Sequence, residues 1–217
     1  MEQSDQPGRV ILVDKPLGWT SFDVVNKLRY KLKTKKIGHA GTLDPLATGL
    51  LILCTGKMTK RIDEYQAQEK EYTGTFTLGQ TTPSYDLETQ PSAAVEISQV
   101  THDDILKATT QFLGTIQQVP PIHSAIRVGG KRAYEFARAG KELELKGREV
   151  TISEFEITNI EKPLVAFRVV CSKGTYIRSL ANDFGKALGV GAHLSSLCRT
   201  RIGEFLLKDA QTVDQIE

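Results

Sequence analysis

The sequence has few of the residues that build metal sites, disulfide frameworks or membrane spans. Its three cysteines, Cys54, Cys171 and Cys198, are far apart, and the first two lie in apolar runs where a free thiol behaves as a small hydrophobic group. The four histidines form no HxxxH pattern and no cluster with cysteine, so we expect no metal site. No apolar run approaches the length of a membrane span, and the N-terminus lacks a basic segment followed by an apolar one. These absences favour a reduced, cytoplasmic protein without membrane contact.

Common cofactor and hydrolase motifs are absent as well. GxGxxG and GxSxG do not occur, so dinucleotide chemistry and serine-dependent acyl hydrolysis have no support. LILCTGKMTK resembles a phosphate-binding P-loop at Gly56 and Lys57, but the pattern requires glycine in place of Leu51 and Ser or Thr in place of Met58. We therefore expect an activity that needs no cofactor.

Charge is balanced overall and concentrated locally. The 217 residues are 40% hydrophobic and 25% charged, which is typical of a folded globular protein, and the net charge of +2 does not indicate a nucleic-acid partner. Between residues 27 and 36, however, six basic residues occur without an acidic one: Lys27, Arg29, Lys31, Lys33, Lys35 and Lys36. Such a run is either a solvated helix face or a nucleic-acid contact.

Strands and helices alternate without a clean βαβ series. We predict strands at Val10–Pro16, 47–56, 70–79, Val150–Ile160 and Leu164–Cys171. Helices are expected from Thr20 or Ser21, with Phe22, Val25, Leu28 and Leu32 on its apolar face, and at 57–65, Thr101–Leu113, the segment closed by Gly140, and Thr175–Leu188. The pattern predicts a mixed α/β sheet with helices packed on it. No linker divides the chain, so we expect a polar tail at 1–9 and one domain at 10–217.

The most unusual stretch is GHAGTLDPLATGLLIL, from Gly38 to Leu53. It places one carboxylate, Asp44, in a loop of small and apolar residues, and His39 is its only other ionisable group. Asp-Pro is an ordinary turn initiator, so a purely local turn role is one reading of Asp44. The alternative is a functional carboxylate.

Several long motifs resemble the bacterial tRNA pseudouridine synthases of the TruB type. These are VDKPLGWTS, GHAGTLDPLATGLL, KEY (Lys70 to Tyr72), PPIHSAIRVGGKRAYEFARAG, CSKGTYIRSLANDFGKALG and HLSSLCRTRIG, in the family's order over nearly the whole chain. The resemblance implies the pseudouridine synthase fold, a mixed, largely antiparallel sheet with flanking helices and a central RNA-binding cleft. It also implies a cytoplasmic isomerase that converts uridine 55 in the T-loop of tRNA to pseudouridine without cofactor or metal. We expect a monomer.

The resemblance also assigns roles to individual residues. The catalytic set falls on Asp44, Tyr72 and Arg178. The expected substrate-binding residues are His39, Tyr72, Tyr176, Leu197, Lys15, Lys131 and Arg132.

The chemistry explains why such residues are needed. A carboxylate in a dry pocket must stay ionised, which a paired guanidinium favours, and we expect Arg178 in that role. The target base must leave its stack, and an aromatic ring such as that of Tyr72 can stack on it. His39 would occupy or hold open the space that the base leaves. Plain core packing for Tyr72 and a turn role for His39 remain open.

Two departures from the family pattern and two alternative functions also follow. Bacterial relatives commonly continue into a small RNA-binding PUA domain, whereas this chain stops at Glu217, and the loop TTPSYDLETQP lacks a glycine after its aspartate.

A same-family uridine isomerase with another RNA target, including the guide-RNA-dependent relatives, is one alternative. A non-catalytic RNA-binding or RNA-folding module is the other.

Overall fold

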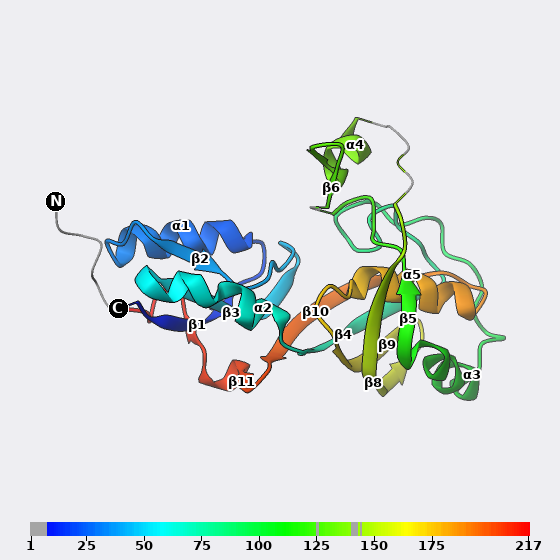
Figure 1. Cartoon of the computed structure of the whole chain (residues 1–217). Helices are drawn as coiled ribbons and strands as arrows, with labels where there is room; N and C mark the ends of the chain where they lie inside the picture. Colours follow the sequence, from blue (N-terminus) through cyan, green and yellow to red (C-terminus); the bar gives the residue numbers. More distant parts are fainter. Residues whose placement is uncertain (1–7, 125, 140–142, 144) are drawn as a thin grey trace. The chain divides into compact units, whose positions relative to one another are not determined.

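The computed structural model describes residues 8–124, 126–139, 143 and 145–217. The chain divides into two compact units (Figure 1). Unit 1 comprises the chain up to Thr73 together with Ser196–Glu217, and unit 2 is Gly74–Ser195. Two strands, β4 (Lys70–Leu78) and β10 (Ala192–Ile202), contribute residues to both units.

Unit 1 is built on a mixed sheet with the strand order β12-β1-β3-β10. Strands β1 and β3 are antiparallel, whereas β10 runs parallel to β3 and β12 runs parallel to β1. The short strand β2 also pairs with β3, and β11 pairs with β10. Its elements are β1 (Val10–Lys15), α1 (Ser21–Lys31), β2 (Ile37–His39), β3 (Ala47–Thr55), η1 (Gly56–Arg61), α2 (Ile62–Ala67), β11 (Phe205–Leu206), η3 (Leu207–Asp209) and β12 (Gln211–Thr212).

Strand β3 is buried on both faces, and its alternating side chains enter two hydrophobic clusters. Leu51 and Leu53 pack with β1 and with Val24, Val25 and Leu28 of α1. Leu50, Ile52 and Cys54 enter the other cluster. Met58, Ile62 and Tyr65 pack there as well. A strand covered on both sides reads as a continuous apolar run, and ATGLLILCT is such a run. Unit 1 therefore has a well-packed central strand that begins directly after the Asp44 loop.

Unit 2 contains the sheet order β10-β4-β9-β8-β5, with β5, β8 and β9 antiparallel. A separate two-stranded ribbon pairs β6 with β7 across Gly129 and Gly130, both at positive φ. Five phenylalanines from strands and helices form the aromatic centre of the core: Phe76, Phe112, Phe155, Phe167 and Phe184. Its remaining elements are α3 (His102–Ala108), η2 (Thr109–Phe112), β5 (Gly114–Gln118), β6 (Arg127–Val128), β7 (Lys131–Arg132), α4 (Ala133–Arg138), β8 (Arg148–Glu161), β9 (Leu164–Cys171) and α5 (Ile177–Ala187).

Most of the predicted elements are confirmed, including the mixed sheet with flanking helices. The capping box of Thr101 and Asp104 is present, although α3 ends at Ala108 and continues as the 3-10 turn η2. The prediction that Phe22 belongs to the buried face of α1 is wrong, because its side chain is 59% exposed and Val24 lies inward instead. Gly140 lies outside the described residues. Within the described part of the chain, no helix is both long and apolar enough to cross a membrane.

Candidate active site

The loop that carries Asp44 is held by hydrogen bonds from the start of α1. The backbone N–H of Leu43 donates to Ser21 Oγ (2.8 Å), and the Ser21 hydroxyl donates back to the Leu43 carbonyl (3.2 Å). On the other side of Asp44, the carbonyl of Pro45 accepts a bond from the N–H of Gly18 (2.8 Å). Because both neighbours of the half-buried Asp44 are tied to one segment, the position of its carboxylate is constrained by the fold rather than by a local turn alone.

Two buried cations lie in one row across the sheet just after this loop. Lys15 of β1 pairs with Gly49 of β3, and Gly49 pairs with Arg199 of β10. Gly49 has a φ of 98°, and a Cβ there would lie only 2.4 Å from the backbone oxygen of Arg199, so glycine is required. Directly paired residues project to the same face of a sheet, so Lys15 and Arg199 flank a position without a side chain, about 10 Å apart at their Cα atoms.

Both cations donate to backbone carbonyls. Arg199, which is 1% exposed, donates from Nε to the carbonyl of Leu50 (2.7 Å) and from Nη2 to that of Gly41 (3.2 Å). Its guanidinium thus bridges the two ends of the segment that contains Asp44. Lys15 is fully buried and donates from Nζ to the carbonyls of Pro16 (2.9 Å) and Trp19 (2.5 Å).

The electrostatics of this region link Lys15 to both Asp44 and Arg199. Burial lowers the pKa of Lys15 to about 8; the negative charge of Asp44 opposes this shift and the positive charge of Arg199 adds to it. A carboxylate that attracts a buried amine is itself stabilised in its ionised form by that amine. Unit 1 therefore places at least one positive charge, that of Lys15, where it interacts with Asp44.

Two further predicted residues lie close to this loop in unit 1. His39, at the end of β2, has its pKa lowered by burial and by the charge of Arg199, so its imidazole is neutral near pH 7. Leu197 of β10 pairs with Ala47, whose N–H bonds to the carbonyl of Asp44 (3.0 Å). The structure thus brings Lys15, His39 and Leu197 to the Asp44 loop.

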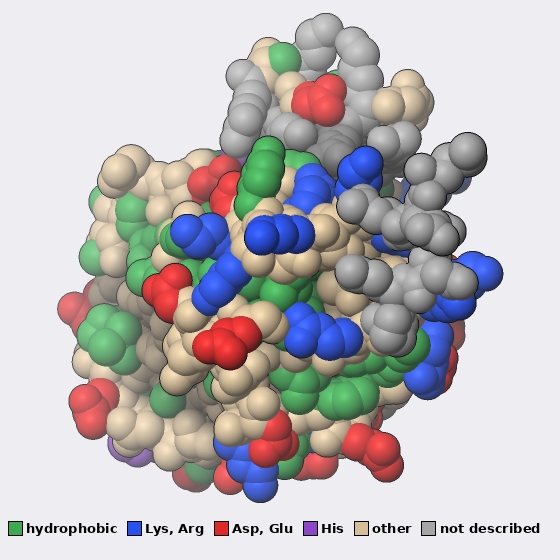
Figure 2. Space-filling model, turned by 90° about the vertical axis from the view of Figure 1, so that its left-hand side faces the viewer, with side chains coloured by type: hydrophobic (Ala, Val, Ile, Leu, Met, Phe, Trp, Pro, Cys, Tyr) green, Lys and Arg blue, Asp and Glu red, His purple; other side chains and the backbone are tan. Residues whose placement is uncertain are grey.

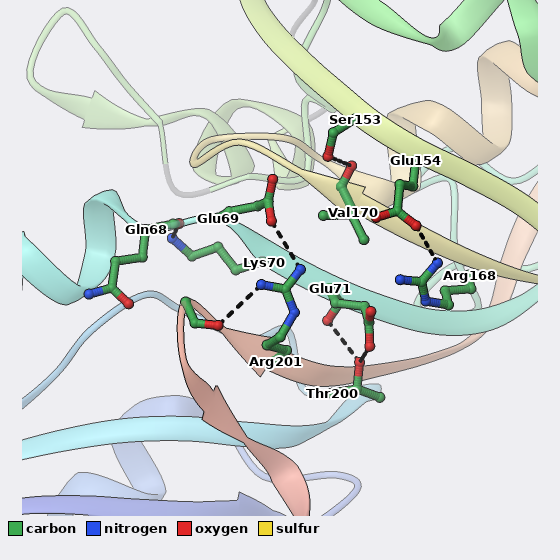
Figure 3. Close-up of polar contacts among 11 residues, drawn as sticks. Gln68, Glu69, Lys70, Glu71, Ser153, Glu154, Arg168, Val170, Thr200 and Arg201 are labelled. Atoms are coloured by element: carbon green, nitrogen blue, oxygen red, sulfur yellow. Dashed lines mark hydrogen bonds and ion pairs between the residues drawn. The ribbon is translucent and has the colours of Figure 1, made fainter.

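Tyr72 is buried, and it lies in the part of β4 that belongs to unit 1. Side-chain bonds connect this part of β4 to the end of β10 (Figure 3). Thr200 Oγ1 donates to Glu71 Oε1 (2.7 Å), and Arg201 forms an ion pair with Glu69 (3.0 Å). These bonds brace the strand on which Tyr72 stands, while its stacking role remains a prediction.

In unit 2, Arg178 lies near a carboxylate that the sequence analysis did not single out. Arg178 Nε is 3.6 Å from Asp86 Oδ2, and both side chains are almost completely buried. Arg178 Nη1 also donates to the carbonyl of His123 (2.9 Å) and, more weakly, to that of Ser84 (3.4 Å). Tyr85, just before Asp86, has a φ of 64°, a left-handed conformation that is rare for an aromatic residue. Asp86 therefore lies at an unusual turn that faces Arg178.

Tyr176 is held at the start of α5 from two sides. The buried side chain of Gln118 accepts a hydrogen bond from the Tyr176 N–H (2.8 Å) and donates one to its carbonyl (3.1 Å). The guanidinium of Arg148 lies over the tyrosine ring, 4.6 Å from its centroid, in cation–π geometry. This backbone arrangement fixes the first turn of α5, which carries Arg178.

Sequence reasoning did not assign roles to Ser21, Arg199 or Asp86. Ser21 and Arg199 lie in the motifs VDKPLGWTS and HLSSLCRTRIG. Asp86 is the aspartate of the loop TTPSYDLETQP, which lacks the glycine expected after it. The side chains of Lys131 and Arg132 lie outside the described part of the structure. Their phosphate contacts, and the catalytic roles of Asp44, Tyr72 and Arg178, remain predictions.

Comparisons with known proteins agree over nearly the whole chain. The family model "TruB family pseudouridylate synthase (N terminal domain)" matches residues 29–177, and "tRNA pseudouridylate synthase B C-terminal domain" matches residues 178–217. The tRNA pseudouridine synthase B of Flavobacterium johnsoniae is 57% identical, with 97% of this chain and 95% of that protein covered. That of Parabacteroides distasonis is 54% identical, with 97% and 92% covered.

A solved structure is similar as well. A chain in the crystal structure of a Cbf5-Nop10-Gar1 complex superposes with a TM-score of 0.74 at 34% identity, covering 94% of this chain. The present chain spans 53% of that solved chain.

Proposed function

The chain belongs to the TruB family of pseudouridylate synthases, which are isomerases, and on this premise we propose that it converts uridine 55 in the T-loop of tRNA to pseudouridine. The observation that carries the proposal is the setting of Asp44, a half-buried carboxylate in a braced loop beside two buried cations. The names of the curated relatives support tRNA as the substrate.

The reaction rearranges bonds within one nucleotide. The bond between uracil N1 and the ribose C1′ breaks, the base turns, and a new bond joins C5 to C1′. C5 loses its proton and N1 gains one, so no atom is gained or lost overall. In our proposal Asp44 is the nucleophile: a carboxylate oxygen bonds to the ribose or to the base while the N1–C1′ bond is broken, and this bond breaks again before pseudouridine is released, which returns Asp44 to the carboxylate form.

Asp44 must remain ionised while it is shielded from water. Burial alone favours a neutral carboxyl group, whereas nearby positive charge favours the carboxylate. Lys15 and Arg199 supply such charge from the same unit and donate to fixed carbonyls, so they do not have to reorganise during the reaction. The buried cations of unit 1 thus support the proposal that Asp44 acts as a carboxylate.

The remaining residues would handle the extruded base. A flipped uracil loses its stacking partners at a cost of about a few kcal/mol, and stacking on an aromatic ring recovers about 1–3 kcal/mol. We assign that ring to Tyr72 and the apolar wall to Leu197. Neutral His39 would fill or hold open the vacated space without adding a second cation. Arg178 and Tyr176 are proposed to act on the same nucleotide.

The test is the substitution Asp44→Asn, which keeps the shape of the side chain and removes its charge. Turnover should fall by at least roughly four orders of magnitude, equivalent to about 5.5 kcal/mol in the barrier. Because pseudouridine has the same mass as uridine, the assay should count tritium released from C5 of labelled uracil in a tRNA transcript. RNA affinity should be retained, since phosphate contacts dominate binding.

A matched control is Asp63→Asn, which changes an exposed aspartate of α2 in the same unit. It should release tritium at the wild-type rate. Wild-type release from Asp44→Asn would return Asp44 to a turn-forming role. Loss of tRNA binding together with release would instead indicate a misfolded loop, which the melting temperature would reveal.

The alternative, action within a protein complex, finds support in the similarity to a chain of the Cbf5-Nop10-Gar1 complex. The identity to that chain is 34%, against 57% for the tRNA pseudouridine synthase B of F. johnsoniae. We therefore favour independent action on tRNA. Activity of the purified chain on a bare T-loop hairpin would rule out a requirement for a guide RNA or a partner protein.

A further inference from the structure

A group of exposed lysines lies at the end of unit 1 opposite Asp44. Strand β3 begins at Ala47, next to the Asp44 turn, and ends at Thr55. Nine extended residues at about 3.3 Å per residue place the two ends of β3 about 26 Å apart. At the far end, the N–H of Gly56 donates to the carbonyl of Lys36 (2.8 Å), so the turn between α1 and β2 lies beside the start of η1.

This contact joins charges from two separate segments into one surface. Its members, here named the distal lysines, are exposed residues of the α1–β2 turn and of η1: Lys33, Lys35, Lys36 and Lys60. Figure 2 faces this end of the molecule and shows Lys and Arg side chains gathered there. The structure thus places Lys60 beside the basic run, although Lys60 follows Lys36 by more than twenty positions in the sequence.

The distal lysines form no ion pair within the described chain, whereas two other basic residues at this end have partners, one acidic and one a backbone carbonyl. Arg61 forms an ion pair with Glu64 (2.7 Å), and Lys31 donates to the carbonyl of Asp214 (2.6 Å). No ion pair of the described residues involves a distal lysine. Like charges held on short, hydrogen-bonded segments repel one another, so a bound polyanion would relieve that repulsion.

We propose that the distal lysines bind phosphates of tRNA outside the T-loop, at a distance of about 25 Å from Asp44. This inference rests on the proposed function, because it assumes that uridine 55 lies at Asp44 when the enzyme acts. Phosphate contacts carry no sequence information, but they set the position of an RNA on a protein. The surface would therefore add affinity for whole tRNA without changing the chemistry.

The experiment compares two substrates. One is a full-length tRNA transcript, and the other is a hairpin that carries only the T-loop and its stem. The variant combines Lys35→Gln, Lys36→Gln and Lys60→Gln, and it leaves Lys33 unchanged because that residue has a left-handed φ of 49°. The Kd for tRNA should rise about tenfold near 0.1 M salt, and the slope of log K against log salt should decrease by about 2–3. The Kd for the hairpin should stay within about twofold, as should the single-turnover rate at saturating tRNA.

The matched control removes the same charge elsewhere, with Lys107→Gln, Lys186→Gln and Lys208→Gln on α3, α5 and η3. It should leave both affinities near the wild-type values. The proposal is overturned if the distal variant binds tRNA like the wild type, which would leave the lysines to another acidic partner. It is equally overturned if tRNA and hairpin are weakened alike, or if the control variant matches the distal one. A wild-type protein that releases no tritium from either substrate would refute the proposed function, whereas the binding comparison would still decide this inference.

Discussion

The two units hold their buried cations in different ways. In unit 1, Arg199 and Lys15 donate to backbone carbonyls, and among the described residues neither has a carboxylate within ion-pair distance. In unit 2, Arg178 has a carboxylate of its own, Asp86, as well as two backbone carbonyls. A carbonyl satisfies the hydrogen-bonding capacity of a cation but does not cancel its charge. Arg178 therefore faces a negative charge within unit 2, whereas the charge of Lys15 in unit 1 interacts with Asp44.

This difference teaches that similar residues can serve opposite needs. A buried ion pair with good geometry fixes orientation but creates little net potential, while an unbalanced buried cation is costly and creates a strong one. Lys15 of unit 1 interacts with Asp44, the residue that our proposal keeps ionised. That Arg178 also keeps Asp44 ionised remains a prediction from the resemblance. Arg199 is a second guanidinium to consider for that role.

The largest effect is expected for Arg178→Lys. An ammonium keeps the charge but cannot reproduce the planar fork that faces Asp86 and the carbonyls of His123 and Ser84. We expect turnover to fall about 10²–10³-fold, with tRNA affinity nearly unchanged. Single-turnover tritium release and filter binding measure the two quantities.

Asp86→Asn provides the complementary variant, because it leaves Arg178 intact and removes the charge that balances it. Removing the charge of one partner of a buried ion pair should lower the free energy of unfolding by about 3–5 kcal/mol, measured by urea denaturation. Turnover should fall as well, because the guanidinium of Arg178 loses the negative charge that helps to hold its orientation. Near-normal turnover in Arg178→Lys would remove Arg178 from the mechanism and leave unit 1 as the sole source of charge control.

A smaller effect is expected for Arg199→Lys. Arg199 reaches the carbonyls of Leu50 and Gly41 from two different nitrogens, whereas a lysine carries all its donors on one nitrogen, so we expect one end of the Asp44 segment to be released. Displacement of a catalytic group by about 1 Å can cost roughly 10²-fold, and we expect a loss of about 10–100-fold in single-turnover rate with little change in tRNA affinity.

Arg201→Lys is the matched control for that variant. It changes the same residue type on the same strand, in a partly exposed ion pair with Glu69. Such pairs contribute little, so the rate should stay within about twofold of the wild type. Equal losses in the two variants would mean that β10 tolerates no change, and that Arg199 has no special relation to Asp44.

Much of the fold was predictable because its patterns are local. The apolar run of β3, the capping box of α3 and the alternation in β4 can be read from neighbouring residues. Strand β10 was missed because Arg199 is buried where the pattern suggests exposure, and β5 was missed because most of its residues are exposed. Patterns among neighbouring residues do not predict a strand correctly where a polar side chain is buried by contacts with distant segments of the chain.

The residues of the candidate site also fall into two groups, those that local motifs reveal and those that they do not. The family motifs pointed to Asp44, His39 and Leu197, and the family assignment that they implied is confirmed by the family models. Arg199 and Asp86 gain their significance from segments far away in the chain, namely the Gly41 and Leu50 carbonyls and Arg178. No spacing rule connects such positions, so only the folded structure reveals them.

The smallest expected effect is the dependence of stability on pH that Lys15 introduces. Burial lowers its pKa to about 8, whereas in the unfolded chain the amine titrates near its ordinary value of 10.5. Between these values the unfolded state binds more protons than the folded state, so the contribution of Lys15 to the free energy of unfolding rises with pH. Urea denaturation of the wild type and of Lys15→Met at about pH 8 and about pH 9.5 measures this as a difference between the two proteins. Burial raises the pKa of Cys54 and of Tyr85, which acts in the opposite direction, but both proteins share these groups and their contributions cancel. The wild type should gain stability relative to the variant as the pH increases. An identical pH dependence would mean that Lys15 keeps its ordinary pKa, and that Asp44 compensates its burial as fully as Asp86 compensates that of Arg178.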